Sequence, residues 1–221
     1  MSESKKTDIS KQKSPFAKKG LRPGDLEKYR LLAIELGASD AKIIKSNQVI
    51  IEHRVLGKCK IPMCVQYGMS MNCPPHAPTP DEVRKMVKEY RYGVFIRLII
   101  PSVRIAGAAA LEGKITAIDR RKINEIVAEV ESQAFYEGHY LAMGFAGGSC
   151  RSSLCNGLEC SALTTKNGCR HGLKARPSME GVGMNVFQMA RNMGWEIHPI
   201  GRRTLPDEIP HGNRLGLVMI A

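Results

Sequence analysis

The sequence predicts an α/β fold in which two pseudo-symmetric halves pack around one core, each half built as strand, cysteine loop, helix and strand. The first observation is the cysteine spacing C-x4-C-x8-C, which occurs twice, at Cys59, Cys64 and Cys73 and again at Cys155, Cys160 and Cys169. A helix-start signal follows each triplet, and a strand-like apolar run follows each of these helices. We therefore expect one domain over residues 23–221, with an internal repeat at about residues 39–100 and 140–200.

The N-terminal 22 residues differ in composition from the rest of the chain. They carry a net charge of +5 out of +12 for the whole chain, and they are rich in Lys and Ser with few apolar residues. Such a segment cannot offset the entropy that it would lose on ordering. We predict a disordered basic arm over residues 1–22, which serves as a solubilising tail or else contacts nucleic acid or an acidic partner.

The elements of the first half follow from local signals. Proline at the start and glycine at the end delimit a helix over residues 23–37, and short strands are expected over residues 41–45 and 48–55. Thr79, followed by proline and by glutamate at position 82, is typical of a capping box that starts a helix over residues 80–91. An apolar run predicts a strand over residues 92–100.

The second half is predicted in the same way. Apolar residues at helical spacing indicate a long helix over residues 115–143 and another over residues 179–193. Strands are expected over residues 195–200 and at the C-terminus, over residues 215–221.

The composition argues against several classes of protein. The longest apolar stretches, such as residues 94–101, fall well short of the roughly 20 residues that a membrane span needs. We read no secretory signal, and an odd number of cysteines does not suit an extracellular disulfide framework, so we expect a cytoplasmic protein without a membrane span. Aromatic residues make up only 5% of the chain. Stacking platforms for bases are therefore not expected, and nucleic acid is not favoured as a partner.

The cysteines are the candidate site. All seven lie in loops rich in Gly, Pro and Asn, and clustered thiols inside a cell indicate metal or redox chemistry. Zinc is the first competitor, because structural zinc sites use cysteines two to four residues apart. Each triplet, however, adds its third thiol only after eight more residues, without a second close pair. This pattern favours iron–sulfur clusters of the [4Fe–4S] type, two in number.

The two loops differ in their number of thiols. The second loop contains a fourth cysteine ahead of its triplet, so that Cys150, Cys155, Cys160 and Cys169 can fill one cluster. The first loop has only three and leaves one iron without a cysteine.

Three arrangements of the first site stay open. A histidine completes it, with His53 and His76 nearest in sequence. Alternatively, solvent or a ligand occupies an open iron, which permits substrate chemistry there. In the third arrangement Cys150 crosses over to the first loop, as cysteines do in two-cluster ferredoxins.

Two further expectations concern the surroundings of the thiols. Met63, Met69 and Met71 are expected to form a dry wall near the first site. Arg176 is expected to pair with Glu180 at the start of the following helix, or else to donate to a sulfur.

The flanks of the cysteines resemble those of a family of cysteine-rich predicted metal-binding proteins of anaerobic bacteria and archaea. The resemblance rests on C-x4-C-x2-Y-G and N-C-P-P-H-A-P-T-P within residues 59–80, and on G-G-S-C, C-R-H and A-R-P-S-M-E-G within residues 147–181. It covers about residues 25–200 and implies an oxygen-sensitive metal centre in an anaerobe's cytoplasm. In the relatives the second loop often reads G-S-C-x2-C, whereas here the gap from Cys150 to Cys155 is wider.

The leading hypothesis is an iron–sulfur protein in which the seven cysteines hold two [4Fe–4S] clusters. It passes electrons between a ferredoxin-like donor and a partner redox enzyme or larger enzyme complex. A second hypothesis is an enzyme or activase that uses the open iron of a three-cysteine cluster. A third is a zinc-stabilised nucleic-acid-binding module, prompted by the basic arm and the net charge.

Overall fold

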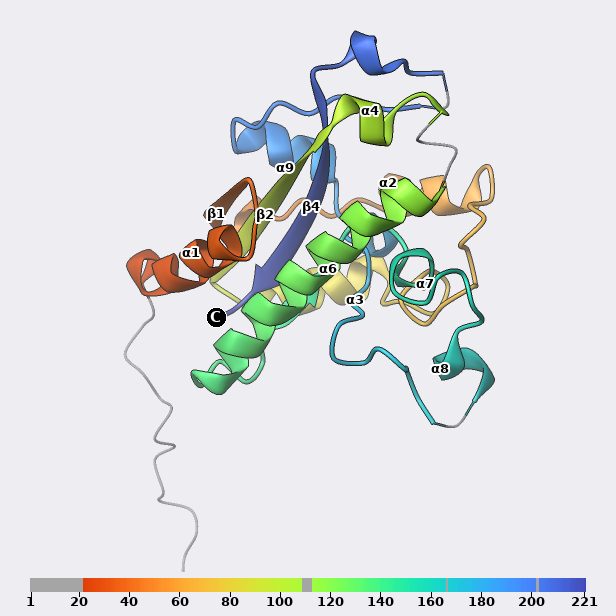
Figure 1. Cartoon of the computed structure of the whole chain (residues 1–221). Helices are drawn as coiled ribbons and strands as arrows, with labels where there is room; N and C mark the ends of the chain where they lie inside the picture. Colours follow the sequence, from red (N-terminus) through yellow and green to blue (C-terminus); the bar gives the residue numbers. More distant parts are fainter. Residues whose placement is uncertain (1–21, 109–112, 166, 202) are drawn as a thin grey trace, which may run out of the picture.

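The computed structural model describes residues 22–108, 113–165, 167–201 and 203–221 (Figure 1). Except for Arg22, the predicted basic arm lies outside the described residues. The strands are β1 (Asp40–Lys45), β2 (Tyr92–Pro101), β3 (Met143–Phe145) and β4 (His211–Met219). The α-helices are α1 (Glu27–Glu35), α2 (His53–Lys60), α3 (Pro80–Lys88), α4 (Ser102–Ile105), α6 (Gly113–Tyr136), α7 (Cys150–Ser153), α8 (Ser161–Thr164) and α9 (Val186–Asn192). Short 3-10 turns are η2 (Pro23–Leu26), η3 (Ser46–Gln48), η4 (Glu180–Val182) and η5 (Pro206–Glu208).

The four strands form one antiparallel sheet in the order β1-β2-β4-β3. The central strands β2 and β4 pair along most of their length, from Gly93 opposite Met219 to Pro101 opposite His211. The first half of the chain supplies β1 and β2, and the second half supplies β3 and β4. Each half therefore contributes one edge strand and one central strand, and the predicted α/β fold with two similar halves is confirmed.

Helices cover both faces of the sheet, and each half supplies one helix to each face. On one face α1 and α6 bury Tyr29, Ala33, Ile123 and Val127 against strand residues such as Val94. On the other face, the buried residues include Val83 and Val87 of α3, Met189 of α9, and Phe95 and Leu217 of the sheet. In Figure 1, α6 runs across the front of β4. The repeated order is thus helix, strand, cysteine loop, helix, strand.

Two predicted helices are shorter than expected because glycines end them. The helix expected over residues 115–143 ends at Tyr136, where Gly138 adopts φ 94° and closes the last turn with a hydrogen bond to Phe135 O. The chain is then free to form β3. The helix expected over residues 179–193 is interrupted by Gly183 at φ 89°, so that it becomes η4 and α9.

The predicted strand over residues 195–200 is wrong. The ring of Trp195 stacks 4.8 Å from that of Phe95, and its Nε1 donates to Asp40 Oδ2 at 2.7 Å. The next carbonyl, Glu196 O, accepts from side chains of the sheet, Arg97 and Asn213. The segment lies over the sheet with its polar groups bonded to side chains, and β4 takes its expected place in the sheet.

The predicted strand over residues 48–55 is also wrong. η3 and the start of α2 flank a short extended piece that pairs with the second half of the chain. Glu52 N donates to Gly183 O and Asn185 N donates to Ile50 O, both at 2.8 Å. These bonds fix the beginning of the first cysteine loop against η4, which follows the second cysteine loop.

Candidate metal centre

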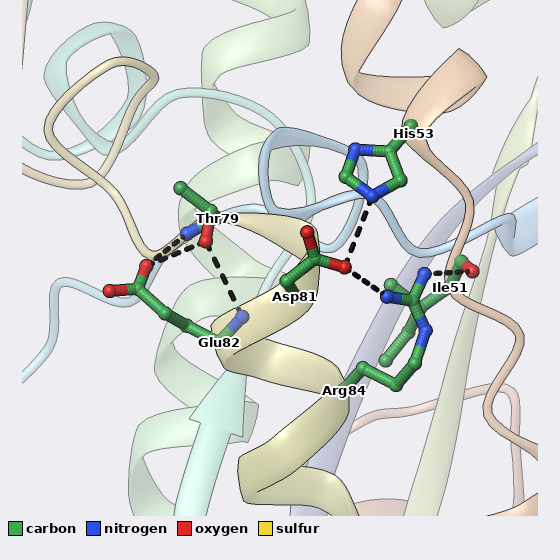
Figure 2. A network of polar contacts seen from close by, with 6 residues as sticks. All are labelled: Ile51, His53, Thr79, Asp81, Glu82 and Arg84. Carbon is green, nitrogen blue, oxygen red and sulfur yellow. Dashed lines mark hydrogen bonds and ion pairs between the residues drawn. The ribbon is translucent and has the colours of Figure 1, made fainter.

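The first cysteine loop is anchored at its end by the predicted capping box of α3 (Figure 2). Thr79 Oγ1 accepts from Glu82 N at 3.3 Å, and Glu82 Oε2 accepts from Thr79 N at 2.7 Å. Within the loop, Gly68 N donates to Pro74 O at 2.7 Å, and Cys73 O accepts from the amides of the next turn. The loop is therefore closed by its own backbone, and Cys73 is buried.

The thiols of the first triplet act on one another electrostatically. Cys59 lies in α2, and its carbonyl accepts a hydrogen bond from Cys64 N at 3.0 Å, which turns the chain back on itself. Burial raises the pKa of the Cys59 thiol, and the nearby thiols of Cys64 and Cys73 raise it further. This mutual effect requires the three sulfurs to lie near one another.

Cys150 lies with the first triplet. Its Sγ accepts from Asn72 Nδ2 at 3.5 Å and lies 3.8 Å from Ser70 Oγ, and both partners belong to the first loop. The preceding residue, Ser149, lies with its Oγ 3.5 Å from Cys73 Sγ. Of the three arrangements that the sequence left open, the geometry favours the crossing of Cys150 to the first loop. We call Cys59, Cys64, Cys73 and Cys150 group one.

The remaining thiols, Cys155, Cys160 and Cys169, form group two. Burial raises the pKa of the Cys155 thiol, and the thiols of Cys169 and Cys160 raise it further, while Arg170 and Arg151 act in the opposite direction. The sulfur of Cys169 accepts from a backbone amide, His171 N, at 3.4 Å. Group two thus has three thiols with arginines close by, whereas Asn72 supplies group one with a side-chain amide donor.

The two groups are neighbours. Cys150 and Cys155 are joined by one turn, with Cys155 N 3.4 Å from Cys150 O. Burial raises the pKa of the Cys150 thiol, the hydrogen bonds with Asn72 and Ser70 lower it in part, and the thiols of Cys73 and Cys155 raise it further. Cys150 therefore interacts electrostatically with thiols of both groups.

Neither predicted histidine completes group one. His53 begins α2, but its Nε2 faces Asp81 Oδ1 at 3.1 Å, an oxygen that also contacts Arg84 (Figure 2). The hydrogen bonds with His53 and Arg84 lower the pKa of the Asp81 carboxyl. His76 is exposed, although its backbone amide bonds to Cys73 O. Cys150, in contrast, contacts the first loop through Asn72 and Ser70.

The two expectations about the surroundings are not met. Met63 is 71% exposed, and Met69 and Met71 are each 43% exposed, so they form no dry wall. Arg176 Nε pairs with Glu131 Oε2 of α6 at 2.5 Å rather than with Glu180. Glu180 lies near Cys59 of group one, where it contributes to the raised pKa of that thiol.

A second cluster of metal-ligating side chains was missed from the sequence. Among the residues that the structure describes, Glu196, His198 and His211 are the only three His, Cys, Asp or Glu residues whose ligand atoms lie within 4.8 Å of one another. Arg97 Nη2, however, lies 2.7 Å from His211 Nε2 and brings a positive charge to the cluster. No spacing motif links the two histidines, so no pattern in the sequence could have identified this cluster. We therefore interpret these residues as a hydrogen-bonded network at the end of the sheet rather than as a metal site.

The donor chemistry of group one suits a metal that prefers sulfur. Thiolates select zinc and iron–sulfur clusters, and four of them can complete either. No three of the seven sulfurs, all of them described, lie within 4.8 Å of one another. A tetrahedral zinc ion, with Zn–S near 2.3 Å, draws its sulfurs to about 3.8 Å from one another. A four-iron cluster accepts thiolates that lie farther from one another, because each thiolate binds a different iron.

The comparisons with known proteins agree with this chemistry. The chain matches none of the curated proteins and none of the solved structures with which it was compared. No helix among the described residues is long and apolar enough to cross a membrane. One family model matches residues 42–220, a range that includes both cysteine groups. The chain belongs to that family, described as predicted metal-binding protein (DUF2284).

Proposed function

We propose that the chain is an iron–sulfur protein that carries two [4Fe–4S] clusters and passes electrons to or within a partner redox enzyme. The observation that carries the proposal is the contact of Cys150 with Asn72 and Ser70 of the first loop, which brings a fourth thiol to that loop near Cys73. Group one would hold one cluster with four thiolates. Group two would hold the other with three, and the clusters would supply one-electron transfer.

The spread of the thiols supports iron–sulfur clusters over zinc. The sulfurs are spaced more widely than one tetrahedral ion requires. Polar hydrogens also reach them, since Asn72 Nδ2 faces Cys150 Sγ and His171 N faces Cys169 Sγ. Hydrogen bonds to sulfur are a main means by which proteins tune the potential of a cluster.

The position of group one supports exchange with a partner protein. Cys64 is exposed, and the apolar side chains around it, Ile61, Met63 and Val65, are 71 to 84% exposed. Lys58 and Lys60 belong to the last turn of α2 beside this rim. An apolar contact edged with positive charge suits an acidic redox partner.

Group two favours a second candidate function, an enzyme or activase with an open iron. Only three thiols gather there, and Cys169 is exposed to solvent. A cluster with three protein thiolates leaves one iron for a ligand from solution. A visible or paramagnetic spectrum that changes when a small ligand is added would support this role, and an unchanged spectrum would contradict it.

The decisive experiment is the content of iron, acid-labile sulfide and zinc per chain in protein purified without oxygen, with a visible spectrum. We expect about eight iron and eight sulfide and a broad brown absorption. About four iron would contradict the second cluster. Stoichiometric zinc in a colourless sample would contradict the redox function altogether.

A further inference from the structure

The net charge of the chain beyond its N-terminal 22 residues lies entirely in the two cysteine loops. Residues 23–221 carry +7. Residues 53–78 account for +3 of this, with no acidic residue, and residues 147–176 account for +4, with a single glutamate, so that the other residues are neutral overall. Two [4Fe–4S] clusters on seven thiolates would bring about −3, and the loops would still be positive.

The two loops meet on one surface. Arg151 of α7 joins them, since its Nη1 lies 3.5 Å from Gln66 Oε1 of the first loop and its Nε donates to Leu158 O at 3.0 Å. A groove of about 1150 Å³ lies between the loops and α6, and its lining includes Val65 of the first loop and Ile118 of α6. Both loops therefore contribute to one concave surface.

Large apolar side chains stay exposed on this surface. Five of them, from three separate segments, are 59 to 84% exposed: Ile61, Met63, Val65, Ile118 and Leu158. The exposed cations Lys58 and Lys60 end α2 directly before the first of these side chains. A group of exposed apolar side chains with a polar rim marks an interaction site.

The chemistry of this surface favours an acidic protein over nucleic acid or a membrane. None of the five exposed apolar side chains is aromatic, so they offer bases no ring on which to stack. The surface is hollowed, whereas insertion into a bilayer needs an apolar face that projects from the protein. An apolar centre edged with cations is complementary to a protein whose own apolar contact is edged with carboxylates.

We propose that this surface is the docking site of a small acidic redox protein, which lies over the groove between the cations of the two loops. The proposal rests on the proposed function, because it identifies the partner of the same thiols. Cys64 is exposed between Met63 and Val65, so the docked partner would cover it. One electron would leave the reduced partner there and reduce the cluster of group one.

The test is calorimetric titration of the full-length protein, with its metal, by an oxidised, acidic plant-type [2Fe–2S] ferredoxin at low and at raised ionic strength. We expect saturable one-to-one binding that weakens as salt is added. Lys58→Gln with Lys60→Gln should weaken it at least about five-fold at low salt, because two charges of the rim are lost. Lys85→Gln with Lys88→Gln is the matched control. These exposed lysines end α3, on the opposite face of the sheet from α6, and their loss should leave the affinity unchanged.

A second variant tests the apolar part of the surface at a position far from any cysteine in the sequence. Ile118 is 62% exposed in the groove, so Ile118→Ser removes an apolar contact without opening the core, and it should also weaken binding at least about five-fold. Its control is Leu31→Ser, at a residue 45% exposed on α1, which lies on the opposite side of the molecule from α7 and α8 (Figure 1). The metal content of every variant is measured first, so that damage to a cluster is recognised.

Three results would overturn the proposal. They are the absence of saturable ferredoxin binding, equal affinity in the two test variants and their controls, and tighter binding of a DNA duplex or of phosphatidylserine vesicles than of ferredoxin. Failure of the proposed function gives a different result. An iron–sulfur protein that does not bind ferredoxin contradicts the docking site alone, whereas a colourless zinc protein that binds ferredoxin contradicts electron transfer alone.

Discussion

The two cysteine triplets have the same spacing and different surroundings. In the first, Cys59 lies in a helix of eight residues, Cys73 is 7% exposed, and Cys150 arrives from the other loop with side-chain partners at Ser70 and Asn72. In the second, the described part of residues 155–169 contains the four-residue helix α8, and the thiols that act on Cys155 are Cys169 and Cys160. The spacing fixes how three thiols can converge, whereas contacts between distant loops decide the coordination number and the polarity of the site.

The largest expected effect tests whether Cys150 binds metal together with group one or with group two. Cys150→Ser should remove the metal of group one, about half of the total. Adding Cys73→Ser should then cost no more metal, because both variants damage the same site, whereas adding Cys160→Ser should remove the rest. The measurement is iron and sulfide per chain in the single and double variants.

The opposite pattern of metal loss would contradict the assignment of Cys150 to group one. If Cys150→Ser with Cys160→Ser loses only half of the iron, and Cys150→Ser with Cys73→Ser loses all of it, Cys150 belongs to group two. Cys→Ser is a suitable change, since it preserves the size of the side chain and removes the soft ligand.

A large difference is also expected in the reactivity of the thiols after metal removal. Cys64 and Cys169 are exposed, whereas Cys150 is 5% exposed and burial raises its pKa. Because the thiolate is the reactive form, alkylation of Cys150 by iodoacetamide should lag at least about ten-fold and should continue to accelerate at pH values above the ordinary thiol range.

Residue-resolved mass spectrometry of samples quenched over time measures these rates, with circular dichroism as the control for retained structure. Equal rates at Cys64 and Cys150 in a folded sample would show that Cys150 does not occupy its buried position. Cys64 and Cys169 are expected to react at equal rates, because each of the two groups has one exposed thiol.

The successes and failures of sequence reasoning follow the same division between local and distant contacts. The capping box at Thr79 and the apolar run that became β2 are local, and both were predicted. The partners of Cys150 at Asn72 and Ser70 lie 78 and 80 residues away along the chain, so that no local pattern could choose among the three arrangements. The segment that begins with Trp195 has the composition of a strand, but packing against Phe95 determined its place.

An intermediate effect is expected from glycines in the second cysteine loop. Gly148 and Gly157 both have positive φ, at 73° and 82°, and alanine in that region of φ costs about 1 kcal/mol. A Cβ at Gly148 would also approach Arg120 Cδ at 2.9 Å, whereas nothing lies within 4 Å of one at Gly157. Gly148→Ala should therefore reduce the free energy of unfolding by about 1 kcal/mol more than Gly157→Ala.

Urea denaturation measures this difference, with the fluorescence of the single, buried Trp195 as the probe. Equal midpoints for the two variants would mean that Arg120 moves aside at no cost. The packing of Arg120 against Gly148 would then be less tight than the structure indicates.

The smallest expected effect is on the reduction potential. Asn72 Nδ2 faces Cys150 Sγ at 3.5 Å, and a donor to sulfur stabilises the more negatively charged, reduced cluster. Asn72→Ala should therefore shift the potential of group one to more negative values, on the order of tens of millivolts, and Asn72→Asp should shift it further because it adds a negative charge.

Asn167→Ala, in the exposed part of the second loop, is the control and should leave both potentials unchanged. A redox titration followed by electron paramagnetic resonance measures the shift. If Asn72→Ala moves the other centre, or neither, the amide does not tune group one, and the difference in polarity between the groups has no functional consequence.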